Sequence, residues 1–450
     1  MEKKKRENYK PFRVLKPNAA GLDIGARSIY VAVPDDRSKE SVRRFDTFTE
    51  DLHKIAEWLK SCKIDTVAME ATGVYWIPIF QILEAYGFEV FLVNARHIKN
   101  VPGRKTDVQD CQWIQHLHTV GFLNSSFRPP QNVCTIRTLL GHRDNLIKAS
   151  VVHVHHIQKA LSQMNLQIHN VISDITGHTG LAILDAILAG ERNPNKLAKN
   201  RDRRIKSDET TIAKSLVGDY LPEHIFTLKQ SLDTYRYHKT LIYECDCEIE
   251  KYLNKFDSRI DSDKKTLPKS KPSRKKKQGN DPHFDLQEHM YRILGTDLTQ
   301  VNGINSLTAH VFFATVGPDL SKFPTSDQFC SWLKLCPYNK ITGDKVISSK
   351  TLKTKNRLAK ALRLSAQALW NSKSFLGDYY RRMRAKHGAP KAITATAHKL
   401  ARIIYYLVKN RVPFSESVFE EQEKRFKKQL ENRIRKQAKT LGLKIVPILS

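Results

Sequence analysis

The sequence predicts an α/β domain at the N-terminus, followed by long helices and a second, mainly helical domain. Strand-like and helix-like hydrophobic patterns alternate over roughly the first 125 residues, which is typical of a layered α/β domain. The hydrophobic period then becomes purely helical, and a basic stretch that cannot form a core divides the helical part. We expect a basic tail at 1–17, the α/β domain at 18–130, a helical region at 131–256, a basic linker at 257–282, a compact helical domain at 283–411 and a charged tail at 412–450.

The strands and helices of the α/β domain follow from short apolar segments. Apolar residues spaced three or four apart predict two helices between the later strands. The expected strands are Ala20–Ile24, Ser28–Val33, Thr66–Glu70 and Glu89–Val93, and the expected helices are Asp51–Lys60 and Ile77–Tyr86.

A long helix is predicted from about residue 133 to about residue 170, because apolar residues recur there every three or four positions without a proline. Its narrow apolar seam suits a coiled coil or a helical hairpin. A second helical stretch, Pro222 to Phe256, has the length to return antiparallel to it. The seam indicates at least a homodimer, and a tetramer would form from two such dimers.

The linker at 257–282 carries many lysines and prolines, so we expect either a basic tether that contacts phosphates or a plain solvated linker. The domain after it is predicted to be compact and helical. Near the end of the chain, Phe414 to Lys439 has the pattern of a charged amphipathic helix.

The composition favours a nucleic-acid partner. Lysine and arginine number 76 against 46 acidic residues, giving a formal net charge of +30. A merely well-solvated basic surface is the alternative. No apolar run approaches the roughly 18 residues that a membrane span needs, and we expect no membrane partner. The seven cysteines form no C-x-x-C pair, so neither a disulfide framework nor a zinc site is indicated, and a cytoplasmic protein, nucleoid-associated when active, is expected.

Four carboxylates form the candidate catalytic site. Asp23 lies within an apolar strand, where an unpaired carboxylate is costly, and Glu70 ends another strand beside a glycine turn. Asp107 and Asp110 are three residues apart at the start of a helical pattern, which puts both on one helix face. The alternative for this pair is that acidic residues in a first turn simply suit the helix dipole.

Together the four carboxylates can hold two Mg²⁺ ions through oxygen atoms. Two-metal sites clamp the attacking and leaving oxygens in a phosphodiester displacement. Three cations just before the acidic pair, Lys99, Arg104 and Lys105, are expected to hold the scissile phosphates.

Three motifs resemble one family of transposases. They are Gly21-Leu22-Asp23-Ile24-Gly25, Ala68-Met69-Glu70-Ala71-Thr72-Gly73-Val74-Tyr75-Trp76 and Lys105-Thr106-Asp107-Val108-Gln109-Asp110. They are similar to the D, E, D and D motifs of insertion-sequence transposases with a RuvC-like domain, the bridge-RNA-guided recombinases, which include the pilin-gene invertase. The likeness extends from about Ala19 to about Lys409. It implies an RNase H-like (RuvC-like) α/β domain, a coiled-coil insertion, a C-terminal transposase domain and a guide RNA that pairs with donor and target DNA.

The same resemblance implies a hydroxyl nucleophile in the second domain. The family loop usually carries a serine before two glycines and a lysine, and that serine attacks DNA phosphate. This chain has Thr342 at the serine position, then Gly343-Asp344 and Lys345. A threonine hydroxyl can attack phosphorus, although its χ1 is restricted. Ser348 and Ser349 are the alternative nucleophiles, and a capping role in a loop is the structural alternative for Thr342.

Other candidate nucleic-acid contacts lie in the helical domain. Residues Leu298 to Ala309 have the pattern helix, glycine turn, helix, so Gly303 is predicted either to grip a phosphate in a helix-hairpin-helix element or to form an ordinary αα-corner. Arg357, Arg381 and Arg382 lie in basic helical stretches suited to phosphate contacts. His398 is expected to be structural.

The predicted function is a Mg²⁺-dependent DNA transposase or recombinase that cuts and rejoins strands through a covalent intermediate, guided by a non-coding RNA. Two alternatives remain open at this point. The replacement of serine by threonine is compatible with a decayed relative that binds RNA and DNA without cutting. The acidic domain alone would suffice for a RuvC-type nuclease that uses metal-activated water.

Overall fold

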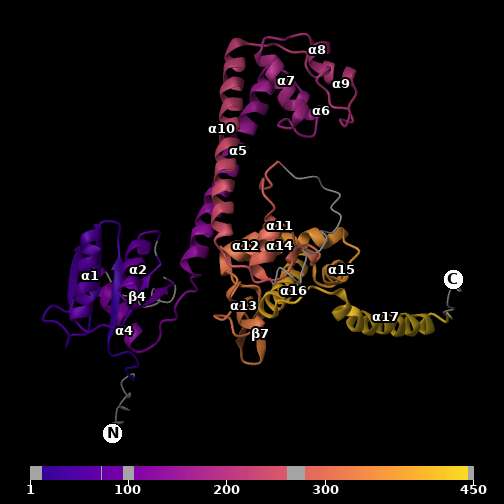
Figure 1. Ribbon diagram of the computed structural model, residues 1–450. Helices are drawn as coiled ribbons and strands as arrows, with labels where there is room; N and C mark the ends of the chain where they lie inside the picture. Colours follow the sequence, from indigo (N-terminus) through magenta and orange to yellow (C-terminus); the bar gives the residue numbers. More distant parts are fainter. Residues whose placement is uncertain (1–12, 72, 95–105, 261–278, 444–450) are drawn as a thin grey trace, which may run out of the picture. The chain divides into compact units, whose positions relative to one another are not determined.

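The computed structural model describes residues 13–71, 73–94, 106–260 and 279–443 (Figure 1). Contacts divide the chain into an N-terminal unit, Met1–Arg128, and a C-terminal unit, Pro129–Ser450. Each is described by itself. Among the described residues, no helix is both long enough and apolar enough to cross a membrane.

The N-terminal unit is built on a five-stranded mixed sheet with the order β3-β2-β1-β4-β5. The three strands β1 to β3 pair antiparallel, whereas β4 pairs parallel with both β1 and β5. The strands are β1 (Ala19–Ile24), β2 (Ser28–Ala32), β3 (Val42–Asp46), β4 (Thr66–Glu70) and β5 (Glu89–Val93).

Helices cover both faces of this sheet. The larger core lies under α1 (Thr49–Ser61) and α2 (Trp76–Ala85), where it includes Leu22 of β1 and Met69 of β4. A smaller core lies on the opposite face under α4 (Asp107–Thr119). The predicted layered α/β domain is therefore confirmed.

One strand escaped the sequence analysis. The five residues of β3 include two adjacent arginines, and every one of them is exposed or only half-buried. An edge strand of this kind lacks the apolar pattern that revealed the other four.

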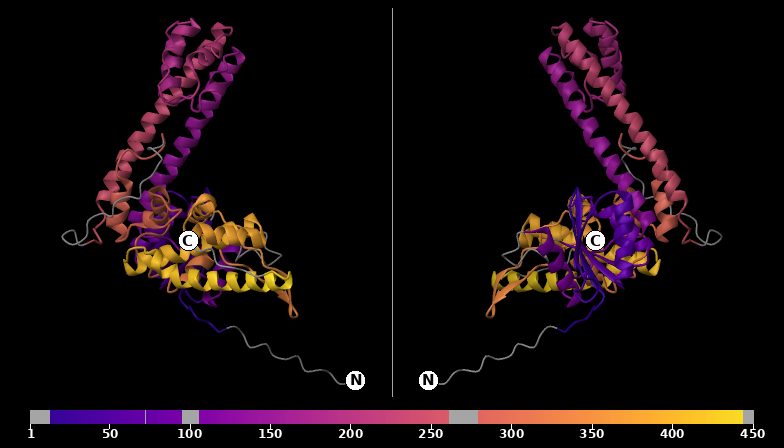
Figure 2. Two further views of the ribbon diagram at one scale, coloured as in Figure 1. Left: turned by 90° about the vertical axis from the view of Figure 1, so that its right-hand side faces the viewer. Right: turned by 90° about the vertical axis from the view of Figure 1, so that its left-hand side faces the viewer.

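The C-terminal unit begins with two helices of equal length, α5 (Gln131–Gln163) and α10 (Pro222–Asn254), which lie side by side (Figure 2). They run antiparallel, because Cys245 contacts the carbonyl of Leu139 while Leu228 joins the same core as Leu161. The predicted antiparallel return is thus observed, whereas the winding of a coiled coil stays a prediction.

The first long helix differs from its prediction in length and in its buried face. It ends at Gln163, well before residue 170, and Asn165 then takes a left-handed conformation with φ of 55°. Val151, placed in the predicted seam, is 42% exposed, whereas Leu146 and Ser150 are buried. A seam drawn from apolar residues alone misses Ser150, whose small side chain allows close packing.

Four short helices close one end of the helix pair. Their apolar residues share a core with Leu161, Leu228 and Leu232 of the long helices. They are α6 (Ile168–Val171), α7 (His178–Leu188), α8 (Pro194–Ala198) and α9 (Glu209–Lys214).

The rest of the C-terminal unit packs around fully buried aromatic residues, among them Phe312, Phe313 and Phe329. This part of the unit is joined to α5, because Arg137 donates hydrogen bonds to the backbone carbonyls of Ala314 and Thr315. The elements are α11 (Leu286–Leu294), η1 (Leu298–Gln300), α12 (Ser306–Val316), α13 (Ser326–Trp332), β6 (Lys340–Thr342), β7 (Lys345–Ser348), α14 (Arg357–Ala368), η2 (Leu369–Asn371), α15 (Phe375–His387), α16 (Ala389–Asn410), η3 (Glu416–Phe419) and α17 (Glu420–Thr440).

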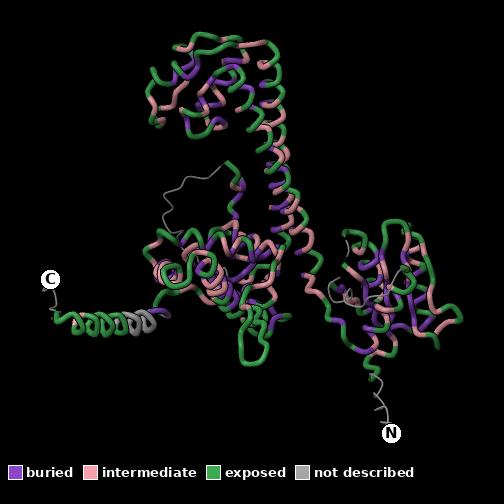
Figure 3. The backbone as a smooth tube through the Cα atoms, turned by 180° about the vertical axis from the view of Figure 1, so that it is seen from behind, coloured by how far each residue is buried: buried purple, intermediate pink, exposed green. Residues whose placement is uncertain are grey.

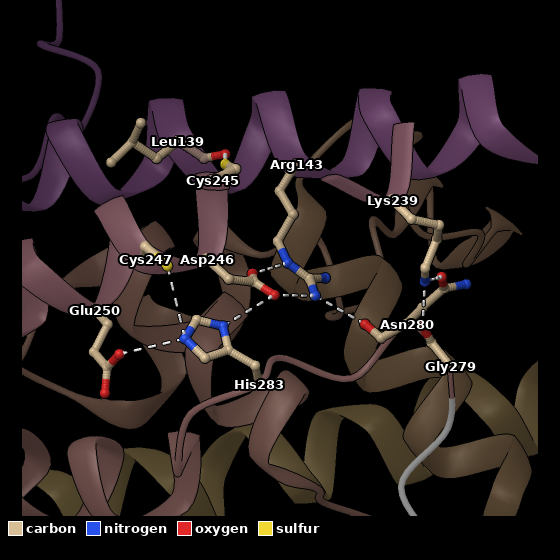
Figure 4. Close-up of polar contacts among 10 residues, drawn as sticks. All are labelled: Leu139, Arg143, Lys239, Cys245, Asp246, Cys247, Glu250, Gly279, Asn280 and His283. Atoms are coloured by element: carbon tan, nitrogen blue, oxygen red, sulfur yellow. Dashed lines mark hydrogen bonds and ion pairs between the residues drawn. The ribbon is translucent and has the colours of Figure 1, made fainter. Parts of the chain in front are cut away.

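A buried ion pair holds the long helices together and fixes one end of the predicted linker (Figure 4). Arg143 of α5 is bidentate to Asp246 of α10, and both side chains are about 4% exposed. Arg143 also donates to the carbonyl of Asn280 at 2.9 Å, and Lys239 donates to the carbonyl of Gly279. The residues just before α11 are therefore attached to the long helices.

The other end of the linker is fixed as well, because the backbone nitrogen of Arg259 donates to the carbonyl of Arg292 at 2.9 Å. Both ends of the predicted linker therefore attach within one unit. Residues 261–278 lie outside the described part of the chain.

Replacing Asp246 by alanine should lower the free energy of unfolding by about 3–5 kcal/mol, because it leaves the buried Arg143 guanidinium without a counter-charge. The matched control is Asp185→Ala, which breaks the exposed pair between Asp185 and Arg236 and should cost about 0–1 kcal/mol. Thermal and urea unfolding of the full chain measure both. Equal losses in the two variants would contradict a special role for the buried pair.

Candidate functional site

Asp23 lies on the face of the sheet that α4 covers. Side chains alternate along a strand, and Leu22 and Ile24 both belong to the core on the opposite face. Asp23 therefore shares its face with Gly21. A Cβ atom at Gly21 would lie under 3.0 Å from the backbone nitrogen of Gln115 and the carbonyl oxygen of Cys111. The glycine thus allows the backbone of α4 to rest directly against β1.

Glu70 reaches the same face from the neighbouring strand. Strand β4 runs parallel to β1 with Leu22 opposite Met69, so Asp23 and Glu70 follow at the same end of the two strands. Ala68 belongs to the small core under α4, and alternation places Glu70 on that side too. The two carboxylates are half-buried.

Asp107 and Asp110 occupy the first turn of α4. The helix begins after Thr106, whose side chain accepts a hydrogen bond of 3.3 Å from the backbone nitrogen of Gln109. The predicted helical start is confirmed. Asp107 is exposed and Asp110 is half-buried.

The four carboxylates interact electrostatically. The pKa of Asp23 is raised from 3.8 to about 6, first by burial and then by the negative charges of Asp107, Asp110 and Glu70, in that order. Burial, together with the charge of Asp23, also raises the pKa of the Cys111 thiol to about 12, so this cysteine is not a nucleophile.

The carboxylates are near one another without being at ligand distances. Among the residues that the structure describes, no group of three or more His, Cys, Asp or Glu side chains is arranged so that it could hold a metal ion. Like charges repel, and the oxygen donors fit a hard divalent cation, which would relieve that repulsion. The chemistry of the set thus fits Mg²⁺, whereas its assignment as the metal site stays a proposal.

The residues predicted to bind nucleic acid lie in different parts of the chain. Lys99, Arg104 and Lys105 lie outside the described residues. Arg357 forms an ion pair with Asp144 of α5, so its positive charge is matched by a carboxylate of the same chain.

Arg381 and Arg382 also contact other residues of the chain. Arg381 forms an ion pair with Asp378 and donates to the carbonyls of Trp370 and Ser372, at 2.9 Å and 2.6 Å. Arg382 lies 5.8 Å from the ring centre of Phe375. The role of these arginines in nucleic-acid binding stays a prediction, and the structure adds their contacts within the chain.

Gly303 is explained by packing. It has φ of 89°, and a Cβ atom would lie 2.9 Å from the carbonyl oxygen of Ser365 and 3.0 Å from Cγ of Leu369. The turn before α12 therefore presses against α14 and η2, which favours the αα-corner over a phosphate grip.

Thr342 ends β6 at the tip of a β-hairpin, a feature that the sequence analysis took for a loop. It pairs with Lys345 across a two-residue turn in which Gly343 has φ of 50°. Both Thr342 and Lys345 are exposed. Of the two alternative nucleophiles, Ser348 is half-buried and accepts a hydrogen bond from the backbone of Lys350, whereas Ser349 is exposed.

Aromatic and basic side chains form a cluster on α15 and its neighbours, of which the sequence analysis identified only Arg381 and Arg382. The guanidinium of Arg384 lies 4.0 Å from the ring centre of Trp370, which is 43% exposed. Lys399 lies over the rings of Phe375 and Tyr379, and burial lowers its pKa to about 8. Interleaved aromatic and basic residues are a signal for nucleic-acid binding, and Trp370 and Lys399 belong with it.

In the absence of divalent cations, stability should fall as pH rises from about 4 through about 6, because folding raises the pKa of Asp23 and so disfavours its charged form. Asp23→Asn should remove this loss, becoming more stable than the native chain above pH 6 and matching it below pH 4. Thermal unfolding across this pH range measures the effect. The control is Asp46→Asn on the exposed edge strand, and identical profiles for all three proteins would refute the coupling.

Comparison with known proteins supports both parts of the chain. The family model for the DEDD transposase domain of the IS110 family matches residues 20–166. The model for the transposase IS116/IS110/IS902 family matches residues 295–381. A search of curated proteins gave no match. Because the two matches cover just over half of the chain in the order expected of this architecture, the chain belongs to the IS110 family of transposases, enzymes that act on DNA.

Proposed function

We propose that this transposase cuts and rejoins DNA with chemistry divided between its two units. Asp23, Glu70, Asp107 and Asp110 of the N-terminal unit would hold Mg²⁺, which would bind and polarise a DNA phosphate. The proposed nucleophile is Thr342 of the C-terminal unit. The observation that supports the proposal is geometric, because Asp23 and Glu70 lie at the same end of adjacent parallel strands and α4 rests directly on Gly21 of the same strand as Asp23. Asp107 and Asp110 in the first turn of α4 are near enough to raise the pKa of Asp23. A hard divalent cation would relieve the repulsion among these oxygens.

The sheet supports an RNase H-like class for the N-terminal unit. Three antiparallel strands followed by two parallel ones, in the order β3-β2-β1-β4-β5, form the arrangement expected of that class. Its acidic residues then belong at the centre of the sheet. Asp23 on β1 and Glu70 on β4 are on adjacent central strands.

The fold places the four carboxylates beside one another. The close contact of α4 with Gly21 holds the first turn of the helix, with Asp107 and Asp110, beside the ends of β1 and β4. Bound there, Mg²⁺ would polarise the phosphate and stabilise the leaving oxygen. The half-buried position of Asp23 limits competition from water for its oxygens.

Thr342 supplies the nucleophile. Its Oγ1 forms a bond to phosphorus while the bond from phosphorus to the adjoining deoxyribose oxygen breaks, and the hydroxyl proton passes to that leaving oxygen. The phosphodiester energy is kept in the threonine–DNA bond, so the reverse attack by a different strand rejoins DNA without a nucleotide cofactor. The exposed hairpin tip leaves the hydroxyl accessible to a bulky duplex.

The partners in this proposal are donor and target DNA, a non-coding guide RNA and further copies of the chain as a dimer or tetramer, within the cytoplasm. The large positive charge supports polyanionic partners. Sequencing RNA that co-purifies with the full chain tests the guide, because its pairing segments should match both DNA partners.

Mg²⁺ at about 100 times its Kd should add about 2.7 kcal/mol of stability to the native chain, because only the folded state assembles the four carboxylates. Asp23→Asn should lose this gain. Thermal unfolding with and without Mg²⁺ measures it, independently of activity. Asp46→Asn is the control, and a gain that survives in Asp23→Asn would move the metal site elsewhere.

Native protein incubated with DNA, co-purified RNA and Mg²⁺ should yield a covalent protein–DNA species on a denaturing gel. Thr342→Ala should abolish it, whereas Thr342→Ser should keep it because the hydroxyl is retained. An adduct that persists in Thr342→Ala would assign the attack to Ser348 or Ser349, to be separated by single alanine variants. Free ends without any adduct would instead favour a nuclease that uses metal-activated water.

A further inference from the structure

The β6–β7 hairpin is exposed along most of its length (Figure 3), and it carries several apolar side chains. Ile341, Val346 and Ile347 are 56–66% exposed, and Tyr338 just before the hairpin is 51% exposed. Clustered apolar side chains on a surface usually mark a contact with a partner, because leaving them in water is unfavourable.

The register of the hairpin gathers these side chains beside the proposed nucleophile. Ile341 pairs with Val346, whereas Lys340 pairs with Ser348, so Ile347 is the extra residue of a β-bulge. The next pair toward the tip is Thr342 with Lys345. The apolar patch thus begins one residue from Thr342.

The charge around the patch identifies its occupant. The segment from Pro337 to Asn356 carries five lysines and a single acidic residue, Asp344. Lys340, Lys345 and Lys350 are exposed on or beside the hairpin. A second copy of this basic surface would be repelled, whereas nucleic acid offers phosphates for the lysines and stacked bases for the apolar side chains.

We propose that the β6–β7 hairpin is a wedge that inserts Ile341, Val346 and Ile347 between stacked base pairs of DNA, next to the phosphate that Thr342 attacks. This inference rests on the proposed role of Thr342. A two-stranded ribbon fits the major groove, and apolar wedges unstack and kink a duplex at a cost of a few kcal/mol per step. The lysines flanking the patch offset that cost through phosphate contacts and hold the hairpin in register. Unstacking frees the backbone at one step, where the hydroxyl can approach in line.

The experiment uses the full chain with Thr342→Ala, so that no strand is cut, and duplex DNA carrying 2-aminopurine at several positions. Fluorescence of this base rises when it is unstacked. We expect the rise on binding to be about twofold or more in this background, and to be lost when Ile341→Ala, Val346→Ala and Ile347→Ala are added. DNA affinity should stay within about threefold, because the lysines remain.

The matched control is Leu364→Ala in the same background, which removes an apolar side chain of 58% exposure from α14. It should leave the fluorescence rise intact. Single variants Ile341→Ala and Ile347→Ala should each lose part of the rise, which separates a wedge from a misfolded hairpin.

Three results would overturn the wedge. The first is a fluorescence rise that persists in the triple variant, and the second is the absence of any rise in the Thr342→Ala background. The third is a change in the oligomeric state of the triple variant on light scattering, which would mark a contact between copies of the chain. Each leaves the covalent-adduct assay of the Thr342-containing chain unaffected, so failure of the wedge is distinguishable from failure of the proposed function.

Discussion

The contact between the backbone of α4 and the bare Cα of Gly21 is the constraint on which the acidic site depends. Any side chain at this position would collide with Gln115 and Cys111 and push the helix away from β1. With glycine there, the first turn of α4 reaches the strand ends that carry Asp23 and Glu70. Burial and the neighbouring carboxylates together raise the pKa of Asp23, so keeping this aspartate charged is unfavourable in the folded chain. Burial of apolar side chains in the two cores of the sheet offsets this cost.

A second constraint acts in the C-terminal unit. The buried pair of Arg143 and Asp246 joins the two long helices, and the carbonyl of Asn280 accepts a further hydrogen bond from the same guanidinium. Because a buried charge must be matched, this one residue fixes both the helix pair and the chain segment that enters α11. The long helices, the aromatic core around Phe329 and the β6–β7 hairpin belong to one unit.

The sequence was informative where burial imposes a pattern and silent where partners are distant. Four strands and the start of α4 near Asp107 could be predicted, because the spacing of apolar residues is a local signal. The ion pair of Arg143 and Asp246 could not, because 103 residues separate its members. The intramolecular partners of Arg357 and Arg381 could not be predicted either. Their charge suggested nucleic acid, yet the fold gives each a carboxylate partner of its own.

The hairpin bears on whether threonine suits the proposed role of Thr342 as nucleophile. A β-branched side chain restricts χ1, which weakens a flexible loop nucleophile but suits a strand, where such residues pack well on the pleated surface. Thr342 is the last residue of β6 and is held by its pairing with Lys345. The strand therefore fixes the backbone and the branched side chain limits the hydroxyl to few directions, so less rotational freedom would be lost in the proposed attack on phosphorus. A threonine in this strand is thus compatible with the proposed nucleophile.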